Sequence, residues 1–305
     1  MRKRMILFVI VGSIFLISLF KGCSCNNTWE IEQRDWEAPN WTSDGKIVFL
    51  EHHFIQKWKH EITGDNQAGG TEEITVYEIN SDKTGLRKVA KILGDEFEYG
   101  PDLGGINTSS AGDWIVMSIE DWKRGDHYPV MYVLKRDGTN LKEIGSGLYP
   151  DFSPNAEKIV YQKKDGGIWI MNRDGSGEHC IVPDPDAKYP AWSADGKRIA
   201  YVVGYPNVDT LLVVDTTGIL LRSFSVEIDM PDWGPIDSSA VSGSGGGHAR
   251  IIYYDSGNVN NLSSVPAGWG GGAKWSPEES LFIGWVSGEF CITDRISGSK
   301  WYLKP

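Results

Sequence analysis

The chain repeats one short pattern about every 40 residues, and this repetition limits its fold more than any other feature. A typical copy has a proline, an aromatic residue two positions later, a hydroxyl residue, a tight turn and an alternating apolar run. The copies are "PNWTSDGKIVFL" from Pro39, "INTSSAGDWIVMS" from Ile106, "PDFSPNAEKIVYQ" from Pro150, "PAWSADGKRIAYV" from Pro190, "PDWGP" from Pro231 and "AKWSPEESLFIGWV" from Ala273. A repeat of this length indicates an array of one supersecondary unit.

A second half-repeat follows most copies and completes the unit. Examples are "ITVYEINSD" from Ile74, "VMYVLKRDGTN" from Val130 and "GIWIMNRDGSG" from Gly167. Two apolar strands from each half give four strands per unit, which is the composition of a propeller blade. The sequence therefore predicts an all-β fold, a six-bladed β-propeller of four-stranded antiparallel blades over residues 37–305. Blade five is expected to be reduced, because "GPIDSSAVSGSGGGHARIIYY" lengthens its first hairpin at the expense of its outer strands.

Each part of the repeat has a physical role in such a blade. The proline begins an inner strand, where one missing amide donor is tolerated. The aromatic residue supplies a large apolar area that packs one blade on the next. The Asp-Gly pairs, at Asp44-Gly45 and Asp195-Gly196, allow the positive φ of a tight hairpin turn.

These residues resemble a known family. The motif Pro-x-Trp-Ser-x-Asp-Gly-Lys-x-Ile, with Ile-Trp-Ile-Met-Asn-Arg-Asp-Gly, is similar to the repeat of TolB-type, WD-like β-propellers. The resemblance covers roughly residues 37 to 305 and implies the propeller architecture. TolB proteins also carry an α/β domain before the propeller, and we find no counterpart of it here. The resemblance therefore implies an architecture. Binding proteins, peptidase gating domains and some lyases share this architecture.

The first residues indicate export. A basic Met1–Arg4 precedes an apolar run from Met5 to Phe20, which suits a signal peptide over residues 1–22, although a short anchor helix is an alternative. Gly22-Cys23 resembles the end of a bacterial lipoprotein signal and makes Cys23 the candidate lipidation site. Residues 23–36 are expected to form a tether that contributes an outer strand to close the ring. The predicted location is a lipoprotein anchored to the membrane, periplasmic or at the cell surface.

Two insertions interrupt the repeat between the second and third strands of blades one and two. They are "EHHFIQKWKHEITGDNQAGGTEE", residues 51–73, and "EDWKRGDHYP", residues 120–129. Loops at this place in a propeller emerge on one face, so the two insertions are expected to be neighbours there. Inserted loops on a rigid scaffold commonly bind ligands, and aromatic residues and arginine dominate recognition surfaces. The candidate ligand-binding residues are Trp58, His60, Trp122, Arg124, His127 and Tyr128.

The sequence favours a binding module over an enzyme. The formal charge of −11 argues against binding to nucleic acid. No spacing nominates a catalytic triad, and Gly-x-Ser-x-Gly is absent from the sequence. We therefore expect a non-catalytic binding or scaffolding module, a monomer without cofactor or metal, that contacts the membrane only through its N-terminal anchor. It would present one propeller face to an envelope protein or a carbohydrate. The alternative is a propeller-type polysaccharide lyase or hydrolase with a metal bound by His52, His53, His60 and His127.

The two cysteines outside the N-terminal region are expected to remain unpaired. Cys180 and Cys291 fall in blades three and six, on opposite sides of the ring, where the distance for a disulfide cannot be met. Two separate buried thiols are the expected arrangement.

Overall fold

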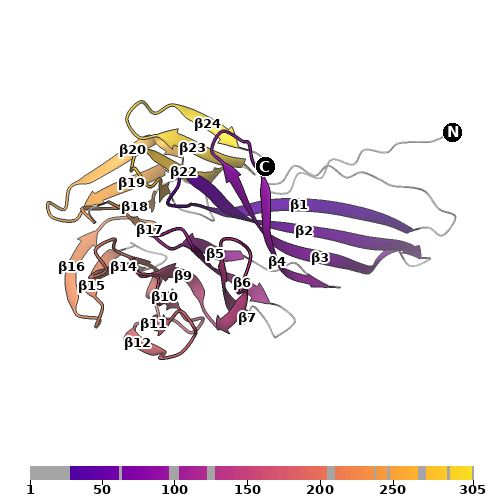
Figure 1. The fold of residues 1–305 in the computed structure, drawn as a ribbon, viewed down its shortest axis with the longest axis horizontal. Helices are drawn as coiled ribbons and strands as arrows, with labels where there is room; N and C mark the ends of the chain where they lie inside the picture. Colours follow the sequence, from indigo (N-terminus) through magenta and orange to yellow (C-terminus); the bar gives the residue numbers. More distant parts are fainter. Residues whose placement is uncertain are drawn as a thin grey trace.

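The computed structural model describes residues 28–61, 64–95, 103–121, 128–204, 210–236, 238–245, 248–266, 273–286 and 289–303. These residues form six four-stranded antiparallel sheets arranged as a β-propeller, as the repeat predicts (Figure 1). Each sheet is built from four strands that are consecutive in the sequence. Within the described residues, no helix is long and apolar enough to span a membrane.

The strands follow one order in every blade, from the innermost to the outermost. Blade one contains β1 (Thr28–Trp41), β2 (Lys46–Glu61), β3 (Gly64–Asn80) and β4 (Arg87–Asp95); blade two contains β5 (Leu103–Thr108), β6 (Trp114–Asp121), β7 (Tyr128–Lys135) and β8 (Lys142–Gly145); blade three contains β9 (Leu148–Phe152), β10 (Lys158–Gln162), β11 (Ile168–Asn172) and β12 (His179–Val182). Blade four contains β13 (Lys188–Trp192), β14 (Arg198–Val203), β15 (Thr210–Asp215) and β16 (Leu220–Ser225); blade five contains β17 (Asp229–Trp233), β18 (Ala240–Gly245), β19 (His248–Tyr253) and β20 (Val259–Pro266); blade six contains β21 (Lys274–Trp275), β22 (Leu281–Val286), β23 (Glu289–Asp294) and β24 (Lys300–Leu303).

The inner hairpins form for the reasons that the repeat suggests. In blade four, Trp192 is buried and the next residue, Ser193, accepts a hydrogen bond from the amide of Arg198 at 2.9 Å. The Ser193 hydroxyl donates to Asp195 at 2.6 Å, and Gly196 closes the turn with a φ of 71°. The hydroxyl after the aromatic residue thus satisfies a turn amide that water would otherwise have to reach.

The glycine of the outer turn has a role that involves the neighbouring blade. A Cβ at Gly175 would lie 2.5 Å from the carbonyl oxygen of Ile144 in blade two, so the turn of blade three can approach β8 only without a side chain. Gly138 and Gly218 meet the blades before them in the same way, at Val89 and Ile181. The repeated Asp-Gly and Thr-Gly pairs therefore contribute to blade–blade packing as well as to the turn.

The ring closes by packing between blades one and six. All four strands of blade six come from residues 274–303, so the first and last blades exchange no strand within the described part of the chain. Their shared core contains Phe49 and Ile79 from blade one and Phe290 and Ile292 from blade six. The sequence predicts instead that residues 23–36 contribute a ring-closing outer strand. The described part of that segment, residues 28–36, belongs to β1 and pairs with β2 of blade one.

Blade five has its full set of four strands, so the prediction that it is reduced was wrong. The glycine-rich run that looked like a long hairpin loop enters β18 as far as Gly245. A Cβ at Gly243 would lie 2.5 Å from the Ile228 side chain and 2.7 Å from the Asp229 carbonyl oxygen. The small residues therefore let the start of blade five pack closely on β18.

The insertion in blade one is an extension of its sheet. β1, β2 and β3 continue beyond the ring as a three-stranded arm, formed by residues 28–36, 51–61 and 64–73 (Figure 1). Thr28 is paired with Lys59, and β2 pairs with β3 out to Glu61 and Gly64. The interpretation of residues 51–73 as a loop was wrong, because β1 supplies a pairing partner from outside the repeat. We call this extension the blade one arm.

Candidate functional site

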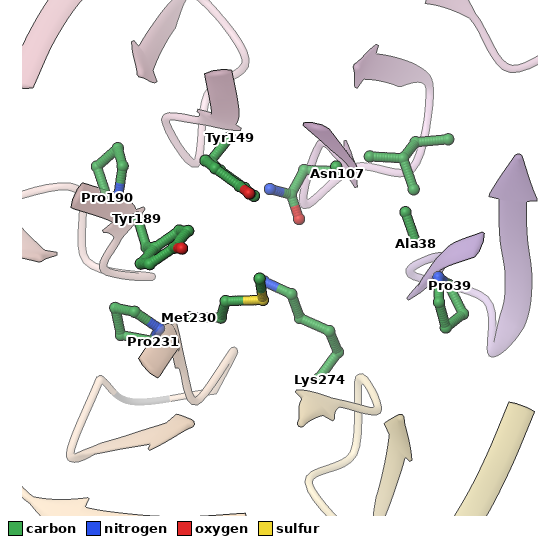
Figure 2. Close-up of a pocket in the computed structure, with 11 residues that line it drawn as sticks. Ala38, Pro39, Asn107, Tyr149, Tyr189, Pro190, Met230, Pro231 and Lys274 are labelled. Atoms are coloured by element: carbon green, nitrogen blue, oxygen red, sulfur yellow. The ribbon is translucent and has the colours of Figure 1, made fainter. Parts of the chain in front are cut away.

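The inner strands of the blades share a bulge that forms one mouth of the central channel. The residue before each inner-strand proline has a positive φ, 53° at Ala38, 51° at Tyr149, 54° at Tyr189 and 48° at Met230. Gly105 has the equivalent place in blade two, with a φ of 112°. The ladder shifts register beside these residues, as a β-bulge requires. We call the surface lined by these five residues and Lys274 the channel mouth (Figure 2).

The bulge belongs to the architecture, but the side chains it presents differ from blade to blade. Blades one and two contribute only Ala38 and Gly105, whereas blades three, four and five contribute Tyr149, Tyr189 and Met230. The two tyrosine rings meet edge to face with their centroids 4.5 Å apart. Figure 2 shows these three side chains turned toward the same central space. The mouth is thus aromatic and apolar on the side of blades three to five, whereas smaller bulge residues and Asn107 line the side of blades one and two.

Below the mouth, polar side chains connect neighbouring blades. Asn40 donates to the Ile106 carbonyl oxygen at 3.2 Å, and Asn107 donates to the Pro150 carbonyl oxygen at 2.7 Å. Asp151 accepts a hydrogen bond from the amide of Trp192 at 2.6 Å. Because these side chains join blades one to four in sequence, they act first as structural links. The equivalent residue in blade four is Ala191, which can form no such bond.

A carboxylate–lysine pair completes this layer. Asp232 of blade five accepts a hydrogen bond from the Trp275 amide at 3.0 Å, and its other carboxylate oxygen lies 3.2 Å from Lys274 Nζ. The Lys274 side chain points into the central space (Figure 2). Burial raises the pKa of Asp151 to about 7; the Trp192 amide and Lys274 oppose this effect, and the charge of Asp232 adds to it.

The raised pKa of Asp151 predicts a loss of stability as the pH rises. In the unfolded chain this carboxyl ionises near 3.8, but in the folded protein it keeps its proton up to about pH 7. The folded state therefore binds more protons between these values, and the free energy of unfolding falls across that window. Asp151→Asn should remove this loss while the amide oxygen still accepts from Trp192. Urea unfolding of both proteins from pH 4 to pH 7.5 measures the effect. Parallel curves for the two proteins would contradict the assignment.

The pocket at the mouth is small. Its volume is about 50 Å³, which is room for a few water molecules but not for a sugar ring. A peptide or carbohydrate bound here would therefore lie over the mouth, against the two tyrosines and Met230. It would not enter the channel.

The residues predicted from the two insertions are only partly within the described structure. Trp58 is half-buried in β2 of the blade one arm, where it is paired with Trp29 of β1, and His60 lies two residues nearer the tip. Tyr128 is the first residue of β7 and pairs with Asp121. Trp122, Arg124, His127 and the lipidation candidate Cys23 lie outside the described residues. The clustering of the six binding candidates stays a prediction.

The arm and the blade two insertion leave the ring on the side of the channel mouth. The arm strand β1 runs directly into Ala38 of the mouth. In blade two, Leu103 pairs with Ile119, so the end of β6 at Asp121 lies on the same side as the mouth residue Gly105. The mouth, the base of the arm and the two described ends of the blade two insertion, Asp121 and Tyr128, therefore lie on one side of the ring.

The two adjacent histidines of the arm do not share a site. His52 lies against Glu72 on the face of the sheet toward blade two, whereas His53 lies 3.0 Å from Glu32 on the opposite face. In the described ranges, no three His, Cys, Asp or Glu side chains come close enough to hold a metal ion. Cys291 is buried as expected, but Cys180 is exposed on the outer strand β12, where the sequence suggested a buried thiol.

Sequence reasoning missed the channel mouth. Its signal was the residue before each inner-strand proline, "AP" in blade one, "YP" in blades three and four and "MP" in blade five. That residue was not singled out, because its importance depends on a bulge that only the pairing of the strands reveals. The sequence predicts the binding residues in the two large insertions, residues 51–73 and 120–129, instead.

Comparison with known proteins agrees with this description at the level of the fold. No protein-family model matches the chain, and no curated protein matches it in sequence. Among solved structures it is similar to TolB from Acinetobacter baumannii, with a TM-score of 0.60 and 12% identity over 90% of this chain and 79% of that one. A nidogen/laminin complex gives 0.59 and 10% identity over 90% and 94%. An oligogalacturonate lyase in complex with manganese gives 0.50 and 11% over 95% and 96%.

These comparisons define the class of protein as a six-bladed β-propeller. Within that class, the chain has a TolB-like propeller fold. At identities of 10 to 12%, the likeness shows architecture, and the three structures carry different names: a TolB, a nidogen/laminin complex and an oligogalacturonate lyase. The function must therefore be argued from the site.

Proposed function

We propose that this protein is a non-catalytic binding module of the cell envelope, and that it presents the channel mouth and the face around it to a protein or carbohydrate partner. The observation that carries the proposal is the edge-to-face pair Tyr149–Tyr189 beside Met230. Each of the three is a large side chain in a left-handed backbone conformation, which costs a non-glycine residue about 1 to 3 kcal/mol. Small residues at the same bulge in blades one and two show that the ring does not require large ones.

The location in the envelope is inferred from the N-terminal sequence. The basic Met1–Arg4, the apolar run to Phe20 and Cys23 are features of an exported lipoprotein. Removal of residues 1–22 would take away four basic residues and no acid, which leaves a net charge of about −15. A partner reached by such a module would be another envelope component.

The histidines of the arm favour binding over the lyase alternative. A lyase of that kind needs its imidazoles to converge on one cation. His52 and His53 instead lie on opposite faces of β2, each against its own glutamate. The test of the alternative is manganese-dependent cleavage of oligogalacturonate by the purified chain, measured as the absorbance of unsaturated products.

The double variant Tyr149→Ala/Tyr189→Ala is expected to lose the partner. Aromatic residues at the centre of an interface contribute about 2 kcal/mol or more each, so the loss of both should raise the dissociation constant by roughly a thousandfold. The experiment is a pull-down from solubilised envelope with the mature chain as bait, followed by titration of the recovered partner. Tyr302→Ala, which removes a 43% exposed tyrosine from β24, is the matched control. Equal affinity of wild type, control and double variant would refute the mouth as the binding site.

A further inference from the structure

The chain enters the blade one arm at the tip, the end that lies farthest from the ring. β1 begins at Thr28, which is paired with Lys59 close to the tip, and runs toward the ring until Ala38 reaches the channel mouth. Ten residue steps separate Thr28 from Ala38, and a strand rises about 3.3 Å per residue. The tip therefore lies roughly 30 Å from the mouth along the arm.

The length of chain before β1 limits how far the tip can be from a membrane anchor. Seven residues, Lys21 to Asn27, separate the apolar run from Thr28. Fully extended, they span at most about 25 Å. If Cys23 carries the lipid, only the four residues Ser24 to Asn27 remain, with a reach of about 14 Å. Either anchor holds the tip of the arm close to the bilayer, and the arm connects that anchor to the ring.

The arm has the internal bonding expected of a stiff support. β2 pairs with β3 out to Glu61, the last residue of β2, and Gly64, the first residue of β3, and it pairs with β1 out to Lys59 and Thr28. On the face toward blade six, Arg34 pairs with Glu51 at 3.2 Å and His53 with Glu32 at 3.0 Å. At the base, Glu73 binds Lys88 of β4 at 2.7 Å and Lys91 at 3.0 Å. These cross-strand bonds fix the direction of the arm relative to blade one.

The tip carries side chains that suit a membrane–water interface. Trp58 is half-buried, and Lys57 and Lys59 beside it are exposed. Tryptophan and lysine are enriched at that depth of the bilayer. Glu30 faces Lys57 across the strands, so the tip is not strongly basic. We therefore assign the membrane contact of the tip to the tether and to Trp58. Charged side chains contribute little to it.

We infer that the blade one arm is a stalk whose tip rests on the membrane surface and whose length holds the ring away from it. This inference rests on the envelope anchoring in the proposed function and adds the orientation of the molecule. The strongly acidic remainder of the mature chain, repelled by an anionic bilayer, favours an upright arm over one lying flat. The channel mouth, which β1 reaches at Ala38 where it enters the ring, then lies roughly 30 Å from the bilayer.

The test compares a fluorophore at the tip of the arm with a fluorophore on the far side of the ring. Each protein variant carries only one of them. The full chain, with Cys25→Ser and Cys180→Ser, and with Cys23→Ser where that residue carries no lipid, receives a single labelled cysteine at Lys59→Cys or, as a second tip position, Lys57→Cys. The matched control is Lys197→Cys, an exposed lysine in the blade four hairpin turn on the side away from the mouth. Cys291 is 2% exposed and can stay. Each protein is reconstituted in vesicles of phosphatidylethanolamine and phosphatidylglycerol that carry a nitroxide on the headgroup.

The expected result is strong quenching at both tip positions and severalfold weaker quenching at Lys197. Equal quenching at tip and ring would mean that the molecule lies flat, and quenching at neither would mean that the arm points away. Both outcomes overturn the stalk while the chain still floats with the vesicles. If the chain does not float, the envelope anchoring itself fails. The pull-down at the channel mouth is independent of all these outcomes and tests the binding proposal separately.

Discussion

Phe49→Ala is expected to lower the free energy of unfolding by about 3 to 5 kcal/mol, the usual range for removing a buried phenylalanine ring. Phe49 is fully buried where blade one meets blade six. Its ring stacks on Tyr77 with centroids 5.8 Å apart and meets Phe290 edge to face at 5.2 Å. Because no strand is exchanged between these blades in the described residues, the ring closes through such packing.

Urea unfolding followed by tryptophan fluorescence measures this effect. Ile296→Ala is the control, since Ile296 is 93% exposed and its removal should change stability by less than about 0.5 kcal/mol. A loss below about 1 kcal/mol in Phe49→Ala would show that the ring does not depend on this contact for closure.

Glu78→Ala should cost about 3 kcal/mol, because it breaks a buried charge network between blades one and two. The Glu78 carboxylate is 2% exposed and binds Arg136 of blade two, Lys46 at 3.0 Å and Arg87 at 3.4 Å. Its removal leaves three cations close together, although Arg136 keeps Asp44 at 2.9 Å and Arg87 keeps the Arg136 carbonyl oxygen at 3.0 Å. Lys88→Ala, at an ion pair whose lysine is 47% exposed, is the control and should cost less than about 1 kcal/mol.

The same network predicts how the effect of Glu78→Ala depends on pH. Burial would raise the pKa of Glu78, but the hydrogen bonds from Arg136 and Lys46 outweigh it and lower the pKa. A carboxylate with a lowered pKa stabilises the fold above its unfolded value of 4.5, and this contribution is lost as the pH falls through the folded value. The stability difference between wild type and Glu78→Ala should therefore shrink below about pH 4.5. A difference that stays constant to pH 2.5 would contradict the ionic origin.

Asp44 should add to the acid sensitivity of the wild type. Partial burial raises the pKa of its carboxyl, but hydrogen bonds from Arg136 and Thr42 lower it to about 2. Because the unfolded value is 3.8, its contribution is present above that pH and disappears as the pH falls toward 2.

The arm shows why part of this structure could not be predicted from the repeat. The segment "EHHFIQKWKH" has charged and polar residues on both faces, so it lacks the apolar alternation that marks a half-buried strand. It is a strand because residues 28–36 pair with it on one side and residues 64–73 on the other. Both partners lie outside the repeated pattern, so the repeat gives no signal for this pairing. The prediction for blade five was wrong for a similar reason. A glycine of β18, Gly243, is required by the close approach of Ile228 and Asp229, which the local sequence does not reveal.

The sequence by itself determined the ring. The spacing of Trp192, Trp233 and Trp275, the hydroxyl after most of the repeated aromatic residues and the Asp-Gly turns are local features. Local hydrogen bonds, such as the one from the Arg198 amide to Ser193, follow from them directly. Only the tertiary structure decided which residues form the channel mouth. Tyr149, Tyr189 and Met230 are about 40 residues apart and meet because a bulge in each inner strand turns them toward a common axis. A site shared by successive repeats exists only once the ring has closed.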